Sequence, residues 1–233
     1  MIEENVVKKI VLIIPSIVNG GMERVMVVIA NRVAKFEGYE VHLISLSYSS
    51  PFYEIHENVN THFICNSKSP MKIIYLLRKK IKLISPNYLI SFGAKYNSFN
   101  LIACMGLRIR TFVSDRSNPY RNTYLTFKKG GLERHDGVLH FLLKQVLYRF
   151  STGILVQTKL AEQIEKKSLN HKNIIYFPNP IFNSFFNLPI VEKRNEILNV
   201  GRFIPSKNQK ILLDIFNKVQ FGDWTLRFIG DGP

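Results

Sequence analysis

The sequence predicts an α/β fold built on a doubly wound parallel sheet. Short apolar segments alternate with helical patterns along most of the 233 residues. The first segment, residues 10–14, is a continuous Ile-Val-Leu-Ile-Ile run, which is typical of a strand buried on both faces. A turn with two adjacent glycines, Gly20 and Gly21, separates this run from a helical pattern. Together these features indicate a βαβ unit at the N-terminus.

The later segments repeat this alternation as far as residue 180. Strands are predicted at residues 10–14, 41–46, 61–65, 88–92, 109–114, 153–157 and 174–177. Ser69-Pro70 is a typical helix start, and Thr158 is placed to cap a short helix. We therefore expect residues 1–180 to form a complete Rossmann-like domain.

A second, incomplete domain is predicted after a linker. Two prolines flank Asn179, and the stretch 181–195 has little regular pattern, as expected of an interdomain linker. Residues 196–233 then hold a strand at 197–200, a helix to residue 219 and a strand at 225–229. Two strands and one helix cannot cover both faces of a parallel sheet, so this Rossmann-like domain is expected to be truncated, with apolar surface exposed.

The charge is strongly positive and unevenly spread. The net charge is +15, and residues 58–114 contain no Asp or Glu but nine Lys or Arg. Such a field attracts phosphorylated substrates and anionic lipid. It also attracts nucleic acid, but no basic motif of a known nucleic-acid module is present, so no nucleic-acid partner is expected.

The predicted helix at residues 70–84 concentrates this charge. Apolar residues line one side, and Lys or Arg residues lie around the other. Two interpretations remain open: an ordinary surface helix packed on the sheet, or a helix that touches an anionic membrane. No apolar run is long enough to span a bilayer and the acidic start lacks a signal-peptide pattern, so a cytoplasmic protein is expected, with peripheral attachment to the inner face of the plasma membrane as the second interpretation.

The two cysteines suggest no chemistry. Cys65 and Cys104 each lie inside an apolar run, which favours buried thiols over a disulfide. No spacing typical of metal ligands occurs, so no metal site is expected.

The loop after the strand at 197–200 is the strongest candidate for ligand binding. It contains Gly201, Arg202 and Lys207, and Ser206 is placed to cap the following helix. A helix N-terminus beside a guanidinium and an ammonium group suits a diphosphate. The alternative is a simple βα turn with two solvated cations.

Residues 200–208, Val-Gly-Arg-Phe-Ile-Pro-Ser-Lys-Asn, resemble the donor-phosphate loop of glycosyltransferase family 4, whose members have the two-domain GT-B fold. The resemblance implies that Arg202 and Lys207 act catalytically, binding the diphosphate of a UDP- or GDP-linked sugar and stabilising the leaving group. It also implies a retaining, metal-independent, hexosyltransferase-like reaction with no cofactor besides the nucleotide-sugar donor. The acceptor would be a saccharide or a lipid-linked molecule, as in cell-surface polysaccharide or glycolipid biosynthesis.

Three further segments are similar to parts of that family. Gly-Gly-Met-Glu-Arg-Val from Gly20 resembles the glycine turn that faces the donor phosphate and acceptor, and the Rossmann dinucleotide fingerprint is absent. Gly230 and Gly232 resemble a second glycine turn, which contacts the nucleotide. Ser-Asp-Arg-Ser-Asn-Pro resembles the segment near the acceptor, so Asp115 is a candidate catalytic residue; alternatively it is structural and held by Arg116.

Two functions follow as hypotheses. The first is the glycosyltransferase described above. The second is a catalytically inactive fragment that binds acceptor lipid or an anionic membrane through its basic face. The family's paired glutamates, which hold the donor, have no counterpart in this sequence, so we expect a truncated chain.

Overall fold

A computed structural model of the chain describes most of its residues. The described ranges are 7–64, 66–116, 127–128, 131–132, 137–181, 192–219 and 222–232, without the side chains of residues 127–141 and 206. The chain forms two compact units, Met1–Phe182 and Asn183–Pro233, and each is described by itself. The division falls within the range 181–195 that the sequence predicts as a linker.

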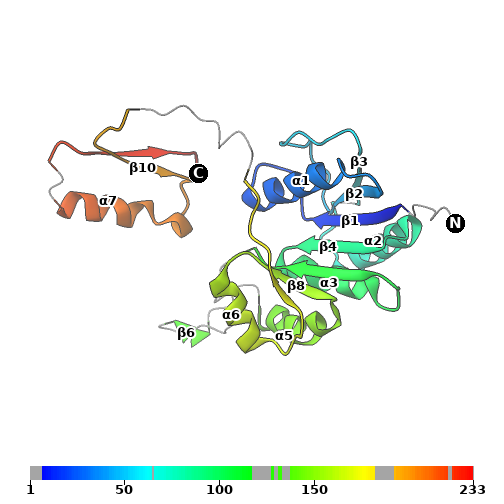
Figure 1. The fold of residues 1–233 in the computed structure, drawn as a ribbon. Helices are drawn as coiled ribbons and strands as arrows, with labels where there is room; N and C mark the ends of the chain where they lie inside the picture. The colour runs from blue at the N-terminus through cyan, green and yellow to red at the C-terminus, as the bar shows by residue number, and fades with distance from the viewer. Residues whose placement is uncertain are drawn as a thin grey trace. The chain divides into compact units, whose positions relative to one another are not determined.

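The first unit is built on a seven-stranded sheet, shown in Figure 1. Its strands are β1 (Lys8–Ile14), β2 (Tyr39–Ser45), β3 (Val59–Phe63), β4 (Tyr88–Phe92), β5 (Arg110–Ser114), β8 (Gly153–Val156) and β9 (Ile174–Tyr176). The order across the sheet is β3-β2-β1-β4-β5-β8-β9, and every pair is parallel. The doubly wound parallel sheet predicted from the sequence is therefore confirmed. A separate two-stranded ribbon pairs β6 (Phe127–Lys128) with β7 (Gly131–Leu132).

Helices cover both faces of this sheet. They are α1 (Gly21–Val33), α2 (Pro70–Ile84), α3 (Ala94–Cys104), α5 (Gly137–Leu147) and α6 (Lys159–Ser168). Alternate side chains of β1 lie on opposite faces of the sheet. Leu12 and Ile14 pack in the cluster that contains residues of α1, whereas Val11 and Ile13 pack with residues of α2 and α3. The continuous apolar run of this strand is explained because both of its faces are buried.

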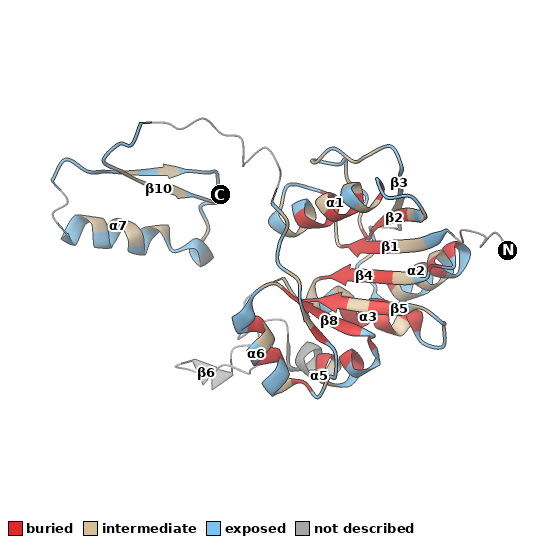
Figure 2. Cartoon of the chain, viewed as in Figure 1, coloured by how far each residue is buried: buried red, intermediate tan, exposed pale blue. Residues whose placement is uncertain are grey.

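Figure 2 shows buried residues concentrated on the central strands of this unit and on the helix surfaces that cover them.

Cys104 belongs to this core and is a free thiol, as predicted, and burial raises its pKa to about 12. Cys65 lies outside the described residues. None of the described helices combines the length and apolarity needed to cross a bilayer.

Local sequence signals set several helix ends. Helix α2 begins at Pro70 directly after Ser69, as predicted. The backbone N–H of Ala161 donates to Thr158 Oγ1 at 3.0 Å, which confirms Thr158 as the cap of α6. Helix α5 ends at Leu147, and the chain continues as a 3₁₀ turn, η1 (Tyr148–Phe150).

The second unit contains a parallel strand pair and one helix. Strand β10 (Glu196–Val200) pairs with β11 (Thr225–Ile229), and α7 (Gln209–Lys218) connects them. The prediction that Ser206 caps this helix is wrong: Ser206 lies within a 3₁₀ turn, η3 (Pro205–Lys207), and α7 begins after Asn208, whose φ is +56°. None of this unit's described residues is buried, as Figure 2 shows.

Candidate functional site

The first unit has a topological switch point between β1 and β4. The chain leaves β1 for β2 on one side and leaves β4 for β5 on the other, so the loops after these strands diverge. In open α/β sheets, ligands bind outside the carboxyl ends of the strands at such a point. Gly93 follows β4 with φ +98°, and a Cβ there would lie 3.8 Å from both Pro15 and Met22. The two loops therefore meet at the carboxyl edge.

The glycine turn after β1 lies at this edge. The Tyr53 hydroxyl donates to the Gly20 carbonyl at 3.0 Å and to Asn19 Oδ1 at 3.2 Å, which fixes the turn from a distant loop. Gly20 is extended, with φ −173°, and Gly21 is the first residue of α1. These backbone angles are open to any residue, so neither glycine is required by its conformation, but a Cβ on Gly20 would collide with the Glu23 carboxylate. Gly21 instead leaves open space, because a Cβ there would meet no atom within 4 Å.

Asp115, which follows β5, lies in a buried polar cluster. Its side chain is only 7% exposed. Lys144 Nζ lies 2.9 Å from Asp115 Oδ2, the Tyr148 hydroxyl donates to Oδ1 at 2.6 Å, and Asn97 Nδ2 donates to Oδ1 at 3.0 Å. Three elements far apart in sequence thus converge on one carboxylate.

The cluster extends to a second carboxylate. Lys144 Nζ lies 2.6 Å from Glu165 Oε1, and both side chains are 3% exposed. Burial acts to lower the Lys144 pKa, but the charges of Asp115 and Glu165 outweigh it and leave the pKa above its ordinary value. Burial, followed by the nearby Asp115 charge, raises the Tyr148 pKa well above its ordinary value. The lysine therefore stays charged and the phenol stays protonated at neutral pH.

Arg116 contacts Asn179 and Phe92, whereas one prediction from the sequence made it the partner of Asp115. Its Nη1 donates to Asn179 Oδ1 at 2.6 Å, and its guanidinium carbon lies 4.0 Å from the centroid of the Phe92 ring. Burial lowers the pKa of Arg116 to about 10. Arg116 thus links the end of β5 to the turn after β9, while Lys144 pairs with Asp115. The catalytic role of Asp115 stays a prediction.

In the second unit, the loops after β10 and β11 are joined by their backbones. The Gly201 N–H donates to the Ile229 carbonyl at 2.9 Å, and the Phe203 N–H donates to the Asp231 carbonyl at 2.8 Å. A Cβ on Gly230 would collide with the Gly201 carbonyl, and a Cβ on Gly232 would collide with the backbone of Phe203. Both glycines are therefore required by close backbone approach.

The two predicted cations project from the first of these loops. Arg202 and Lys207 are both exposed, and no ion pair joins either of them to a described carboxylate. The Arg202 carbonyl accepts a hydrogen bond from Gln209 Nε2 at 2.8 Å, and the Lys207 N–H donates to the Ile204 carbonyl at 2.9 Å. The backbone of the loop is thereby held, while both charged heads stay in solvent.

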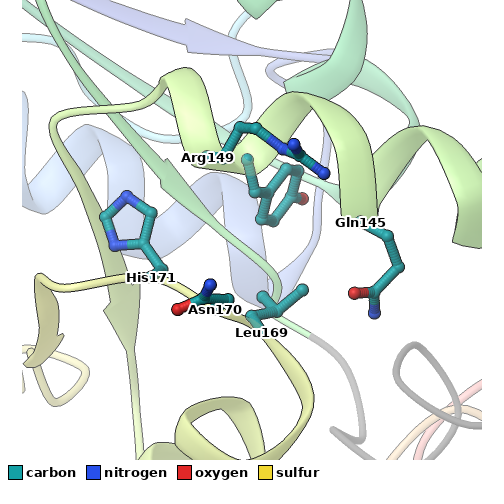
Figure 3. Close-up of a pocket in the computed structure, with 6 residues that line it drawn as sticks. Gln145, Arg149, Leu169, Asn170 and His171 are labelled. Carbon is teal, nitrogen blue, oxygen red and sulfur yellow. The ribbon is translucent and has the colours of Figure 1, made fainter.

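A pocket of about 220 Å³ lies elsewhere on the first unit, as Figure 3 shows. Its lining residues are Gln145, Tyr148, Arg149, Leu169, Asn170 and His171. They come from the end of α5, from η1, which precedes β8, and from the loop before β9, so the pocket lies at the amino ends of these strands. Because ligands in this type of sheet bind at the carboxyl ends, we do not assign it to the site.

Sequence reasoning did not identify the residues that hold Asp115. These are Asn97, Lys144, Tyr148 and, through the lysine, Glu165. The available signal was Lys144 itself, a single cation inside the largely apolar helix Gly137–Leu147.

No group of three or more His, Cys, Asp or Glu in the described parts of the chain is placed to hold a metal ion.

Comparisons with known proteins find glycosyltransferases. No protein-family profile matches the chain. The chain is 25% identical over 220 residues to an uncharacterized glycosyltransferase of Haemophilus influenzae, covering 91% of this chain and 59% of that protein. It is 27% identical over 219 residues to an undecaprenol-diphosphate-linked saccharide α-1,4-N-acetyl-D-galactosaminyltransferase of Campylobacter jejuni, covering 88% of this chain and 55% of that protein. The chain therefore spans less than two thirds of these relatives.

Solved structures identify the fold. HepE from Anabaena, crystallised with UDP and glucose, matches with a TM-score of 0.71 at 12% identity, covering 97% of this chain and 62% of HepE. At such low sequence identity, this match supports a shared fold and nothing further. Taken with the parallel seven-stranded sheet, it gives the chain the α/β fold of the GT-B glycosyltransferases.

Proposed function

We propose that this chain belongs to a retaining glycosyltransferase of family 4. It would transfer a sugar from a UDP- or GDP-linked donor to a saccharide or lipid-linked acceptor in cell-surface polysaccharide or glycolipid biosynthesis. The named activity of the Campylobacter relative, which acts on an undecaprenol-diphosphate-linked saccharide, supports a lipid-linked acceptor.

The loop pair of the second unit is the observation that carries the proposal. The loops after β10 and β11 are joined by backbone hydrogen bonds from Gly201 and Phe203, and Gly230 permits their close approach. Arg202 and Lys207 emerge from this rigid pair with exposed charges. A rigid backbone with two free cations is suited to a doubly charged diphosphate, because little ordering is needed on binding.

The chemistry follows from charge development on the leaving group. As the bond between the sugar's anomeric carbon and the diphosphate oxygen breaks, negative charge accumulates on the diphosphate. The Arg202 guanidinium and the Lys207 ammonium group would stabilise that charge, at about 1.5–3 kcal/mol for each charge-assisted hydrogen bond. The acceptor hydroxyl oxygen would bond to the anomeric carbon on the face from which the diphosphate leaves, which retains the configuration, and its proton would pass to the departing diphosphate.

A donor titration tests these roles. Isothermal calorimetry of the chain with a UDP-sugar and a GDP-sugar measures affinity without requiring turnover. Arg202→Ala and Lys207→Ala should each weaken binding by about tenfold or more, as the loss of one charge-assisted hydrogen bond implies. Lys218→Ala, at the other end of α7, removes the same charge as a control. Unchanged affinity in both loop variants would show that the assigned roles are wrong.

A second candidate function is binding without transfer. In this case the chain would attach to an acceptor lipid or anionic membrane through its basic face and turn over nothing. The observation in its favour is the absence of any acidic residue from positions 58–114, which include α2 and α3. Lipid binding without donor binding would favour this candidate over the transferase.

A further inference from the structure

Helix α2 has two faces of different composition. Its inner face, Ile73, Leu77, Ile81 and Ile84, is buried against the sheet. Six exposed residues, which we call the outer face, lie opposite: Met71, Lys72, Tyr75, Lys79, Lys82 and Leu83. At 3.6 residues per turn, these six fall within an arc of about 120°.

We propose that the outer face of α2 docks on the surface of an anionic lipid bilayer. The inference deepens the membrane-binding part of the proposed function by assigning it to one surface. It does not depend on the donor chemistry of the second unit.

The apolar members of the outer face are unusually exposed. Leu83 and Met71 are 78% and 76% exposed, the highest values among large hydrophobic side chains in the described part of the chain, and Tyr75 is 66% exposed. An ordinary solvated helix face carries polar residues at such positions. Side chains of this kind enter the headgroup region of a bilayer, with tyrosine placing its ring there and its hydroxyl toward water.

The charges around these side chains are all positive. Lys72, Lys79 and Lys82 are exposed between the apolar residues. Helix α3, which packs beside α2, contributes Lys95 and no acidic residue. A lysine can extend its ammonium group to lipid phosphates while its methylene stem lies along the apolar surface. The outer face therefore matches an anionic bilayer in both charge and hydrophobicity.

An aromatic pair, Tyr48 and Phe63, contacts the segment that precedes α2. The Tyr48 N–H donates to Asn66 Oδ1 at 2.7 Å, in the segment that leads into α2. The Tyr48 ring packs on Phe63 with a centroid distance of 4.9 Å, and Tyr48 is 72% exposed. Phe63 is the last residue of β3, so the aromatic pair lies at the carboxyl edge of the sheet.

Not every basic residue of α2 takes part. Arg78 Nη1 donates to the carbonyls of Ala103 and Met105, both at 2.8 Å, and thereby joins α2 to the end of α3. We therefore leave Arg78 out of the docking surface.

Vesicle co-sedimentation tests the proposal. The whole chain is mixed with phosphatidylcholine vesicles containing about half phosphatidylglycerol, and with pure phosphatidylcholine vesicles. Binding is expected to the anionic vesicles only and to weaken as salt rises from about 0.1 M to about 0.5 M. At about fivefold for each lysine near the surface, Lys72→Gln, Lys79→Gln and Lys82→Gln together should weaken binding by about 100-fold.

Matched controls separate the outer face from net charge and general hydrophobicity. Lys166→Gln, Lys167→Gln and Lys172→Gln remove the same charge from exposed positions on and after α6 and should cost much less affinity. Met71→Ser, Tyr75→Ser and Leu83→Ser should also weaken binding, unlike Leu142→Ser, Val146→Ser and Leu160→Ser at other exposed positions. Circular dichroism checks that each variant is folded.

Absence of binding to anionic vesicles, or equal losses in the outer-face and control variants, would overturn the proposal. The donor titration is independent, because the outer-face substitutions lie in the first unit and should leave nucleotide-sugar affinity unchanged. An unchanged chain that binds the donor but not anionic vesicles would therefore overturn this surface and leave the transferase assignment standing.

Discussion

The two units use charge at the ends of parallel strands in opposite ways. After β5 of the first unit, Asp115 is 7% exposed and is neutralised by Lys144, which is itself 3% exposed. After β10 of the second unit, Arg202 and Lys207 are exposed and unpaired with any described carboxylate. Burial therefore decides the role: paired, buried charges are occupied by one another, and free, exposed ones are available to a ligand.

The largest effect should come from removing the buried cation. Lys144→Met removes the buried cation that pairs with both Asp115 and Glu165, so we expect a loss of about 3–5 kcal/mol in the free energy of unfolding, measured with urea. Lys159→Met is the control, because Lys159 pairs with Glu162 at the surface and its loss should cost much less stability. Equal losses in the two variants would remove the distinction between buried and exposed charge.

Gly230→Ala should break the second unit locally. The added Cβ would collide with the Gly201 carbonyl, so we expect a cost of about 1–3 kcal/mol together with faster hydrogen exchange at the Phe203 amide. Gly201→Ala tests the same loop pair without a collision, because the nearest atom would be Gln209 Nε2 at 4.0 Å. If the two variants lost the same stability and showed the same hydrogen exchange at Phe203, the close backbone approach at Gly230 would not be what holds these loops together.

A histidine pair predicts a pH dependence confined to the first unit. His42 Nδ1 lies 3.0 Å from His62 Nε2. Burial, followed by the charge of Lys80, lowers the pKa of His62 to about 4, and burial also lowers that of His42 despite the opposing charge of Glu40. The unfolded chain therefore binds more protons than the folded one between pH 6.5 and about 4, and stability must fall as pH falls through that window.

We expect this fall to be about 1 kcal/mol, because His62 keeps some solvent access and Glu40 opposes the effect of burial on His42. Urea titrations at a series of pH values measure it, and His62→Gln should flatten the profile over the same window. A free energy of unfolding that rises on acidification would contradict this expectation.

The smallest effect on stability should come from the loop cation. Arg202→Ala removes an exposed side chain, so its free energy of unfolding should stay within about 0.5 kcal/mol of the unchanged protein. Thermal unfolding measures this change. A larger loss would mean that the Arg202 side chain stabilises the fold and is not free to bind a ligand.

Most of the first unit's fold could be predicted from the sequence. Its strands are short apolar runs because both faces of the sheet are covered, and two helix starts carry recognisable signals, Pro70 in α2 and the cap Thr158 of α6. Helix α3 has no clear amphipathic pattern because it is buried on several sides, where Asn97 and Asn100 are as inaccessible as Phe99. The start of α7 was missed because Asn208 adopts a left-handed conformation that propensity does not reveal.

The candidate site was only partly predictable. Arg202 and Lys207 lie in one contiguous loop motif, so the sequence displays them together. The partners of Asp115 come from distant positions: Asn97 is 18 residues before it and Tyr148 is 33 residues after it. Such pairings depend on how helices pack on the sheet, and neither residue type nor spacing encodes them.

The amide of Asn97 ties this cluster together. It accepts a hydrogen bond from the Ser91 hydroxyl and contacts the Ser114 carbonyl, Asp115 and Tyr148 through its nitrogen. Substituting one of these residues alone would leave a buried polar group of another without its hydrogen-bond partner. Among homologues, these positions should consequently vary as a set or stay fixed, so that an isolated exchange at any one of them would mark a protein whose core has been rebuilt.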